Sequence, residues 1–391
     1  MRRKNNMKRV TGKRMSWLLF VLALILTCAC GADEDGMSQE SSTGKEENLK
    51  TVHQMELDYA NQFQVECYED GYRLITIADG GQFFVVPKNK PVPKWLKESV
   101  VVLQQPVENI YLAATSAMDL FTALDGLDAI GLSGTEAEGW YVPEAKKAME
   151  DGKILYAGKY SAPDYERILA ENCGLAVEST MIYHKPQVKE QLESFGVPVL
   201  VERSSYESHP LGRMEWIKLY GILLGKETEA EDFFQEQKEK VELVIQEENT
   251  EQTAAFFSIN SNGSVNVRKS GDYVPKMIEM AGGRYVLQNL QEEENALSTM
   301  NMQMEAFYAQ AKEADVLIYN STIEGEISTM EELLQKSSLL AEFRAVKEGN
   351  VWCTGQNLFQ DSTKLADVIL EMHQIFQQEE GNFTYLHKLT R

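Results

Sequence analysis

SSYESHPLGRMEWIKLYGILLGKETEAEDFFQEQKEKVELVIQEEN, residues 204–249, predicts two consecutive helices. The first has Pro210 in its opening turn and stops at Gly225, because helices favour proline at their start and glycine just beyond their end. The second, Thr228–Glu247, opens with the capping-box spacing from its first threonine to Glu231. It would span about 30 Å. We interpret it as a rigid connection between two lobes; the alternative is a long surface helix within one domain.

Length and composition define the class of protein. The chain has 391 residues, and 43% of them are hydrophobic, which allows two domains with substantial cores. The formal net charge is −22. So acidic a protein repels phosphate backbones, which excludes nucleic acid as a partner.

The N-terminus has the layout of a bacterial lipoprotein signal. Seven Lys and Arg residues precede an apolar run, Trp17–Leu26, that is too short to span a bilayer comfortably. The junction ILTCACGADED places Ala29 before Cys30 and resembles a lipobox, although Thr27 stands where leucine is usual. We predict that Cys30 carries a lipid anchor on the extracytoplasmic face of the cell membrane. Lipidation of Cys28 and a short uncleaved membrane anchor are the alternatives.

Cleavage before Cys30 would change both the charge and the cysteine content. It would remove seven Lys and Arg residues and no acidic residue, which lowers the formal net charge to −29. Besides the anchor, Cys67, Cys173 and Cys353 would remain. They are scattered, odd in number and without metal-ligand spacing, so we predict buried free thiols.

Hydrophobic periodicity divides the chain into six segments. The predicted segments are a signal peptide (1–29), a disordered tether (30–50), a strand-rich extension (51–105), a first α/β lobe (106–225), a linking helix (226–249) and a second α/β lobe (250–391). In both lobes short apolar runs alternate with helix candidates, which predicts two doubly wound, mostly parallel sheets. Ligands of such sheets bind beyond the carboxyl ends of the strands, so the cleft between the lobes is the predicted binding site.

The sequence offers no recognised catalytic scaffold. It contains no HExxH, no P-loop and no GxGxxG after a strand, so we predict neither an enzyme nor a bound cofactor. Glu207, His209 and Glu215 would make a weak metal site, and five dispersed histidines argue against a metal centre. We interpret His209 as a residue that begins a helix.

Four further segments occur in a fixed order along the chain. They are APDYERILAENCGLAV (162–177), ESHPLGRMEWIKLYGILLGKETEAEDFF (207–234), SGDYVPKMIEMAGG (270–283) and EADVLIYN (313–320). Together they resemble ABC-transporter substrate-binding proteins of the iron-siderophore and cobalamin type, over roughly Val107 to Gln378. One departure is Cys173-Gly174-Leu175-Ala176, where that family usually has a Pro-Asp-Leu-Val run.

The resemblance implies a function without chemistry. A monomeric, lipid-anchored solute-binding protein would capture a metal chelate between its lobes and deliver it to an ABC permease. The chelate would be a siderophore-iron complex, haem or a corrinoid. An extracellular enzyme or a surface sensor with the same two-lobed architecture is the alternative, because fold alone does not fix function.

Candidate ligand contacts follow from side-chain chemistry. Arginine pairs bidentately with carboxylates and stacks on planar rings, and aromatic residues can line cleft walls. The candidates are Arg203, Arg268, Tyr273, Trp140, Tyr160 and Trp352. Salt bridges within a lobe and aromatic core packing are the alternatives for these residues.

The resemblance also implies permease contacts, because each lobe of those proteins offers an acidic residue at its tip. Glu166 matches the position in the first lobe. In the second lobe Lys276 stands where the acid is expected, and Glu279 lies three residues further on the same helical face. We therefore predict that Glu166 and Glu279 dock onto the permease.

Overall fold

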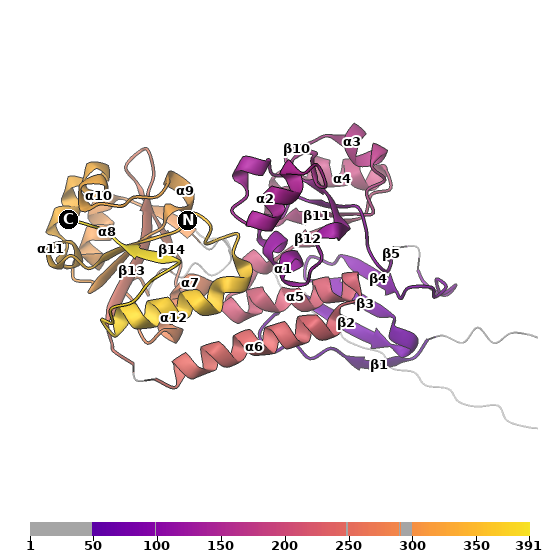
Figure 1. Ribbon diagram of the computed structural model, residues 1–391, viewed down its shortest axis with the longest axis horizontal. Helices are drawn as coiled ribbons and strands as arrows, with labels where there is room; N and C mark the ends of the chain where they lie inside the picture. The colour runs from indigo at the N-terminus through magenta and orange to yellow at the C-terminus, as the bar shows by residue number, and fades with distance from the viewer. Residues whose placement is uncertain (1–48, 98, 248, 289, 291–298) are drawn as a thin grey trace, which may run out of the picture. The chain divides into compact units, whose positions relative to one another are not determined.

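A computed structural model describes residues 49–97, 99–247, 249–288, 290 and 299–391 (Figure 1). The predicted signal peptide, Cys30 and all but the last two residues of the predicted tether lie outside them. No helix among the described residues has both the length and the apolar character needed to cross a membrane. The described chain forms two five-stranded sheets, one seven-stranded sheet and a two-stranded sheet of β9 (Gly158–Lys159) and β10 (Ala162–Pro163).

The N-terminal sheet forms where side chains alternate between core and solvent. Its strands are β1 (Thr51–Gln54), β2 (Phe63–Tyr68), β3 (Arg73–Ile77), β4 (Gln82–Val86) and β5 (Val101–Gln104). The first four pair antiparallel in chain order, and β5 adds parallel to β4. In β2, Phe63, Val65 and Cys67 are buried while Gln64 and Glu66 are exposed, the period of two expected for a sheet with one face on a core.

The first lobe contains a fully parallel sheet. Its strands are β6 (Ile110–Leu112), β7 (Ile130–Ser133), β8 (Leu155–Tyr156), β11 (Leu175–Ser179) and β12 (Val199–Glu202), in the order β12-β11-β6-β7-β8. Its helices are α1 (Met118–Ala123), α2 (Pro143–Glu150), α3 (Tyr165–Ala170) and α4 (Pro186–Ser194). The strand order reverses between β6 and β11, so this is the switch point beside which ligands bind in doubly wound sheets.

The second lobe has a mixed sheet. Its strands are β13 (Thr253–Ile259), β14 (Val265–Arg268), β15 (Arg284–Tyr285), β16 (Thr299–Met302), β17 (Val316–Tyr319), β18 (Val351–Thr354) and β19 (Leu386–Lys388). β13, β15, β17 and β18 are parallel, whereas β14, β16 and β19 pair antiparallel. The prediction of parallel strands therefore holds at the centre and not at the edges. A short turn at residues 260–264 returns the chain directly beside β13, which only antiparallel pairing permits.

The helices of the second lobe follow the same alternation. They are α7 (Tyr273–Met280), α8 (Met304–Ala311), α9 (Ser321–Glu324), α10 (Met330–Lys336), α11 (Arg344–Glu348) and α12 (Leu365–Phe376). Two lobes of alternating strands and helices, with a small strand-rich extension before them, confirm the predicted fold class.

Residues 204–249 form two consecutive helices, as predicted. α5 (Pro210–Leu224) is buried on all sides up to its last residue, and Gly225 ends it in the left-handed conformation with φ 71°. α6 (Glu227–Ile245) exposes one face and packs against both α5 and α12 (Figure 1).

The capping box predicted at Thr228 is wrong. α6 starts one residue earlier, with Lys226 at its N-cap and no side-chain hydrogen bond to the first turn. The N–H of Ala230 already bonds to the carbonyl of Lys226 at 3.1 Å. Thr228 therefore lies inside the first turn, where its hydroxyl cannot act as the cap.

Two buried carboxylates attach the N-terminal sheet to the stretch that contains α5. Glu215 accepts backbone hydrogen bonds of 2.8 Å from each of residues 58–60, and the Nζ of Lys218 lies 3.1 Å away. Glu207 accepts backbone N–H groups of residues 61–62 at 3.0–3.1 Å. The two glutamates that could have suggested a metal site therefore bind the backbone of the N-terminal extension.

The three cysteines within the described residues are free thiols. Cys67 and Cys353 are buried, and Cys173 is partly buried. Burial raises the pKa of all three, that of Cys353 to about 11. A thiol that keeps its proton is a poor nucleophile and metal ligand, so these cysteines act as small apolar side chains.

Glu178 of β11 is a buried acid without a partner. It faces the same side of the sheet as Ala176, and neither carboxyl oxygen has a hydrogen-bond partner among the described residues. Burial raises its pKa from 4.5 to about 8, so the folded protein holds this carboxyl protonated at neutral pH.

This raised pKa predicts a pH-dependent stability. The unfolded chain releases the proton near pH 4.5 and the folded chain only near pH 8, so stability conferred at low pH is lost as the pH rises through this window. Between pH 4.5 and pH 8 the free energy of unfolding therefore falls by on the order of 5 kcal/mol. We expect Glu178→Gln to remove this part of the pH dependence and to raise the urea midpoint at pH 8 more than at pH 4.5.

A matched control is Glu190→Gln, since Glu190 is exposed on α4 of the same lobe. Its urea midpoints should follow the wild-type protein at every pH. Parallel pH profiles for the wild type and Glu178→Gln would contradict a protonated Glu178.

Candidate functional site between the strand ends

The carboxyl ends of the first-lobe strands carry the polar segments that a ligand could meet. At the switch point, the N–H groups of Ala113 and Ala114 bond to the carbonyl of Val177 at 2.9 and 3.1 Å. The chain leaving β6 is therefore held beside the end of β11. The neighbouring strand β12 ends directly before Arg203.

Arg203 contacts the aromatic side chains of Tyr183 and Tyr206. Its Nη1 donates to the Tyr183 hydroxyl at 2.6 Å, and its guanidinium carbon lies 4.6 Å from the centre of the Tyr206 ring. Tyr183 is 38% exposed and Met181 is 46% exposed, although both are large side chains. We name these three residues, together with Met181 two positions before Tyr183 in the sequence, the Arg203 surface: Arg203, Tyr183, Tyr206 and Met181.

Two residues of the N-terminal extension form hydrogen bonds with side chains of this surface. Arg203 Nε donates to Gln62 Oε1 at 3.1 Å, and the Tyr183 hydroxyl donates to Asp79 Oδ2 at 3.0 Å. Burial raises the pKa of Tyr183 to about 12. The phenol therefore stays protonated and can donate its hydrogen bond to Asp79. The guanidinium and the phenol are thus oriented by residues of another sheet.

The second lobe contributes a buried cluster of cations and rings. Arg213 of α5 lies 4.2 Å from the ring centre of Tyr273, and Arg268 lies 4.7 Å from that of Phe359. Arg268 also lies 3.6 Å from Asp272. Burial raises the pKa of Asp272, while the charge of Arg268 acts in the opposite direction. All of these charged groups are less than a tenth exposed, so the cluster joins α5 to the second lobe.

Ser116, in the short helical turn Thr115–Ala117 that follows β6, connects the strand ends of the first lobe to the second lobe. Its hydroxyl donates to Glu202 at 2.9 Å, and its carbonyl accepts the hydroxyl of Ser362 at 2.6 Å. Asp119 accepts the N–H of Thr363 at 2.8 Å. The carboxyl edge of the first sheet therefore faces residues 356–363 of the second lobe.

A second pair of contacts lies beyond the end of β7. The N–H of Tyr141 donates to Gln360 at 2.9 Å, and the amide of Gln360 donates to the carbonyl of Gly139 at 2.8 Å. Asp361 lies between Gln360 and Ser362, which both contact the first lobe. Burial, with the charge of Asp119, raises its pKa to about 6, so the contact region carries an acid that titrates in mildly acidic solution.

The structure separates the six candidate ligand residues. Arg203 and the half-buried Tyr160, in the turn after β9 (Gly158–Lys159), lie on the carboxyl side of the first sheet. Arg268 and Tyr273 belong to the buried cluster above. Trp140 is 3% exposed and its indole donates to Ser133 at 3.1 Å.

Trp352 lies elsewhere. It is 6% exposed, packs edge to face on Phe383 with ring centres 4.8 Å apart, and borders a cavity of about 820 Å³ beside β19.

The two candidate docking acids are both exposed: Glu166 in the first turn of α3, and Glu279 on α7, where Lys276 lies 3.4 Å away.

Five residues at the site were not predicted from sequence, one of which, Tyr206, contacts Arg203 from three positions further along the chain. Met181 and Tyr183 follow Ser179 and Thr180, so their place just after an apolar run is a usable signal. Gln62 and Asp79 carry no such signal, because they meet their partners across 141 and 104 residues of sequence.

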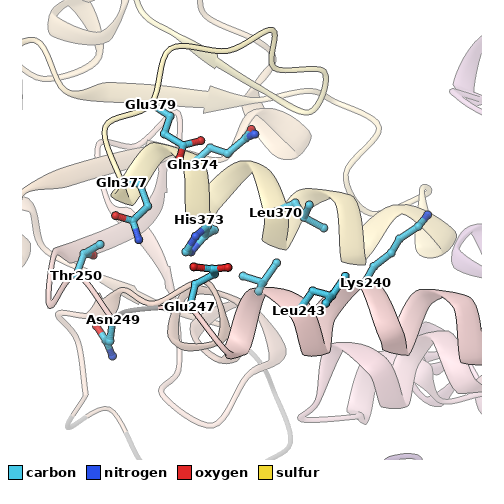
Figure 2. Close-up of a pocket in the computed structure, with 11 residues that line it drawn as sticks. Lys240, Leu243, Glu247, Asn249, Thr250, Leu370, His373, Gln374, Gln377 and Glu379 are labelled. Atoms are coloured by element: carbon cyan, nitrogen blue, oxygen red, sulfur yellow. The ribbon is translucent and has the colours of Figure 1, made fainter.

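A groove between α6 and α12 is another large cavity, of about 870 Å³. Figure 2 shows side chains of both helices around it, among them Lys240 and Leu243 from α6 and Leu370 and His373 from α12. It runs along helix surfaces and not at strand ends. For this reason we do not assign the groove as the binding site.

Metal ligation by the protein itself has no support among the described residues. No group of three or more His, Cys, Asp or Glu side chains there is placed to hold an ion. His209 begins α5, where its Nδ1 accepts the N–H of Leu211 at 3.2 Å, and its ring stacks on Tyr59. Burial lowers its pKa to about 4, so the ring stays neutral, and its place at the N-cap of α5 fits the interpretation of a residue that begins a helix.

Comparisons with known proteins agree with this architecture. Residues 92–358 match the family model described as periplasmic binding protein. An uncharacterized lipoprotein of Methanocaldococcus jannaschii is 25% identical over 320 residues, 79% of this chain and 75% of the relative.

Solved structures share the fold at low sequence identity. A periplasmic haem-binding protein from Pseudomonas aeruginosa superposes with a TM-score of 0.56 and 17% identity, over 73% of this chain and 98% of that one. An ABC-type Fe³⁺-hydroxamate transport protein from Saccharomonospora viridis gives 0.53 and 18%, over 69% and 93%. Because the family model spans well over half of its residues, this chain belongs to the periplasmic binding protein family.

Proposed function

We propose that this protein is a lipid-anchored, extracytoplasmic solute-binding protein that captures a metal chelate between its two lobes and delivers it to an ABC permease. Family membership supports binding of a solute. The observation that carries the choice of ligand is the Arg203 surface, an oriented guanidinium among exposed tyrosine and methionine side chains.

The chemistry of the Arg203 surface suits a large, partly anionic chelate. A guanidinium pairs bidentately with carboxylates and stacks on planar rings, and Tyr183 and Tyr206 offer aromatic faces beside it. Met181 adds a polarizable apolar contact. Siderophores, haem and corrinoids combine anionic or polar edges with large rings or chains. The two solved proteins that share the fold are named for haem binding and for Fe³⁺-hydroxamate transport.

In this proposal the six candidate residues differ in how close they lie to the chelate. Arg203 and Tyr160 would contact the chelate, while Arg268, Tyr273 and Trp140 would support the walls behind it. Trp352 would contribute only from its separate position beside Phe383. The metal would stay within the chelator, since the described residues offer no ligand set.

The proposed location rests on the N-terminal sequence and on the relatives. Cys30 would carry the lipid, and Glu166 and Glu279 would meet the permease. The M. jannaschii relative is itself named a lipoprotein. The protein would act as a monomer, without nucleic acid and without catalysis.

A titration with three chelates tests the ligand class. Ferric hydroxamate siderophore, haemin and cyanocobalamin would each be added to purified protein, and binding would be followed by visible absorbance. We expect one of them to bind, and Arg203→Ala to weaken it about 10- to 100-fold, the range for losing a charged hydrogen bond. Arg203→Lys should fall between, because lysine keeps the charge but loses the fork.

The control for this titration is Arg284→Ala. Arg284 is exposed on β15, away from the strand ends that face the first lobe. The affinity of the Arg284→Ala protein for the chelate should therefore match that of the wild type. Equal affinities for Arg203→Ala and wild type would remove Arg203 from the site, and no binding of any chelate would contradict the ligand class.

A further inference from the structure

A basic loop interrupts this acidic chain between β4 and β5. Residues 87–97, PKNKPVPKWLK, contain four lysines and no acid, although the chain as a whole has a net charge of −22. The next acid in sequence is Glu98. We name residues 87–97 the basic loop.

The lysines of the basic loop are available to an outside partner. Lys88, Lys94 and Lys97 are exposed and form no ion pair with another described residue. Lys90 is 42% exposed at its side chain, and it pairs with Asp70 at 3.2 Å. Three ammonium groups on one short stretch of surface therefore have no acidic partner among the described residues.

An aromatic and apolar base holds this loop in place. Trp95 is half-buried, with its ring centre 5.7 Å from that of Phe84 and 6.2 Å from that of Tyr68. The Tyr72 hydroxyl donates to the carbonyl of Pro91 at 2.9 Å. Val92, at the tip, is 49% exposed. The loop thus presents lysines and an apolar tip from an anchored position, not as a free tail.

The described chain begins at the same place. Leu49, its first residue, lines a cavity of about 330 Å³ together with Lys90, Lys94 and Trp95. The polypeptide that leads back to Cys30 therefore leaves the protein beside the basic loop. Leu49 lies nineteen positions after Cys30 in the sequence, a stretch of chain that reaches at most about 65 Å.

We propose that the basic loop docks on the anionic phospholipid surface of the membrane to which the chain is anchored. The inference rests on the proposed lipid anchor at Cys30. Lysines near an anionic bilayer are attracted by roughly 1 kcal/mol each, within a Debye length of about 10 Å. Elsewhere the acidic chain is repelled, so the loop selects the side that rests on the lipid.

Lysine acylation on vesicles tests this docking. The full lipidated chain would be reconstituted on vesicles of phosphatidylcholine alone or with phosphatidylglycerol, and co-flotation would establish that it is bound. A neutral acylating reagent then labels exposed amines, which are read by mass spectrometry. We expect the basic-loop lysines to react about tenfold more slowly on phosphatidylglycerol vesicles, relative to Lys147, whose side chain is 74% exposed.

Lys90 reports on a variant that lacks the other three lysines. In Lys88→Gln/Lys94→Gln/Lys97→Gln the ratio of docked to free loop should fall roughly a hundredfold, so Lys90 should react as fast as on phosphatidylcholine. The matched control replaces three lysines elsewhere, Lys147, Lys189 and Lys347. With Lys153, also exposed, as its reference amine, this control should keep Lys90 protected, and added salt should remove the protection.

Each failure has its own meaning. A chain that co-floats with both vesicle types, but whose basic-loop lysines show no protection relative to Lys147 on either, would overturn the docking and leave the anchor intact. Basic-loop lysines that are protected to the same extent on both vesicle types would overturn recognition of the lipid by its charge. A chain that does not co-float would overturn the anchor and this inference together.

Discussion

Glu215→Ala is expected to lower the free energy of unfolding by about 3–5 kcal/mol, the range for breaking a buried charge pair. The side chain is fully buried, and its carboxylate accepts three backbone N–H groups from residues 58–60. Alanine would leave these donors without that acceptor, and Lys218 would keep Glu231, at 3.0 Å, as its ion-pair partner among the described residues. Urea unfolding measures the loss, and proteolysis between β1 and β2 should accelerate as the N-terminal sheet detaches.

The close fit around Glu215 supports so large an effect. A Cβ added at Gly212, one turn earlier on α5, would lie 3.0 Å from the carbonyl oxygen of Tyr59, so the segment cannot shift inward to compensate. Glu229→Ala is the matched control, because Glu229 is exposed on α6, and it should stay within about 0.5 kcal/mol of wild type. A similarly small change for Glu215→Ala would show that this carboxylate does not hold the sheet.

Glu166→Lys is expected to abolish chelate uptake in cells while leaving the affinity for chelate unchanged. Glu166 is exposed in the first turn of α3, and a charge pair at such an interface governs encounter and register more than affinity. Reversal of the charge places repulsion where attraction is proposed. Transport of labelled chelate and a binding titration, made on the same variant, separate the two effects.

Two further variants define the docking site. Glu171→Lys changes an exposed acid next to the same helix and should leave uptake intact. Glu279→Lys should abolish uptake if Glu279 replaces the missing acid of the second lobe, although the nearby Lys276 partly compensates its charge. Normal uptake by Glu166→Lys would remove the docking role.

The helices around residues 204–249 could be predicted because their signals are local. Pro210, Gly225 and the apolar spacing lie within the elements that they define. The capping box was wrong because the start of α6 depends on the tight turn after Gly225, which sets the first helical carbonyl at Lys226. A spacing of threonine and glutamate does not contain that information.

The site could be predicted only at the level of strand ends. Arg203 follows β12 as expected, but its partners Gln62 and Tyr183 come from distant segments. Sequence also cannot separate a cleft wall from a core. Trp140 looks like a wall residue until Ser133 is seen to accept its indole N–H at 3.1 Å.

The central claim is that the lobes carry a metal chelate, and the most direct test is to identify what co-purifies with the protein from its native host. Visible absorbance and native mass spectrometry would be recorded on the purified protein before and after denaturation. We predict one chelate per chain, with a ferric siderophore, haem or corrinoid spectrum and a mass that is released on unfolding. A colourless protein that carries a small molecule without metal would contradict the account.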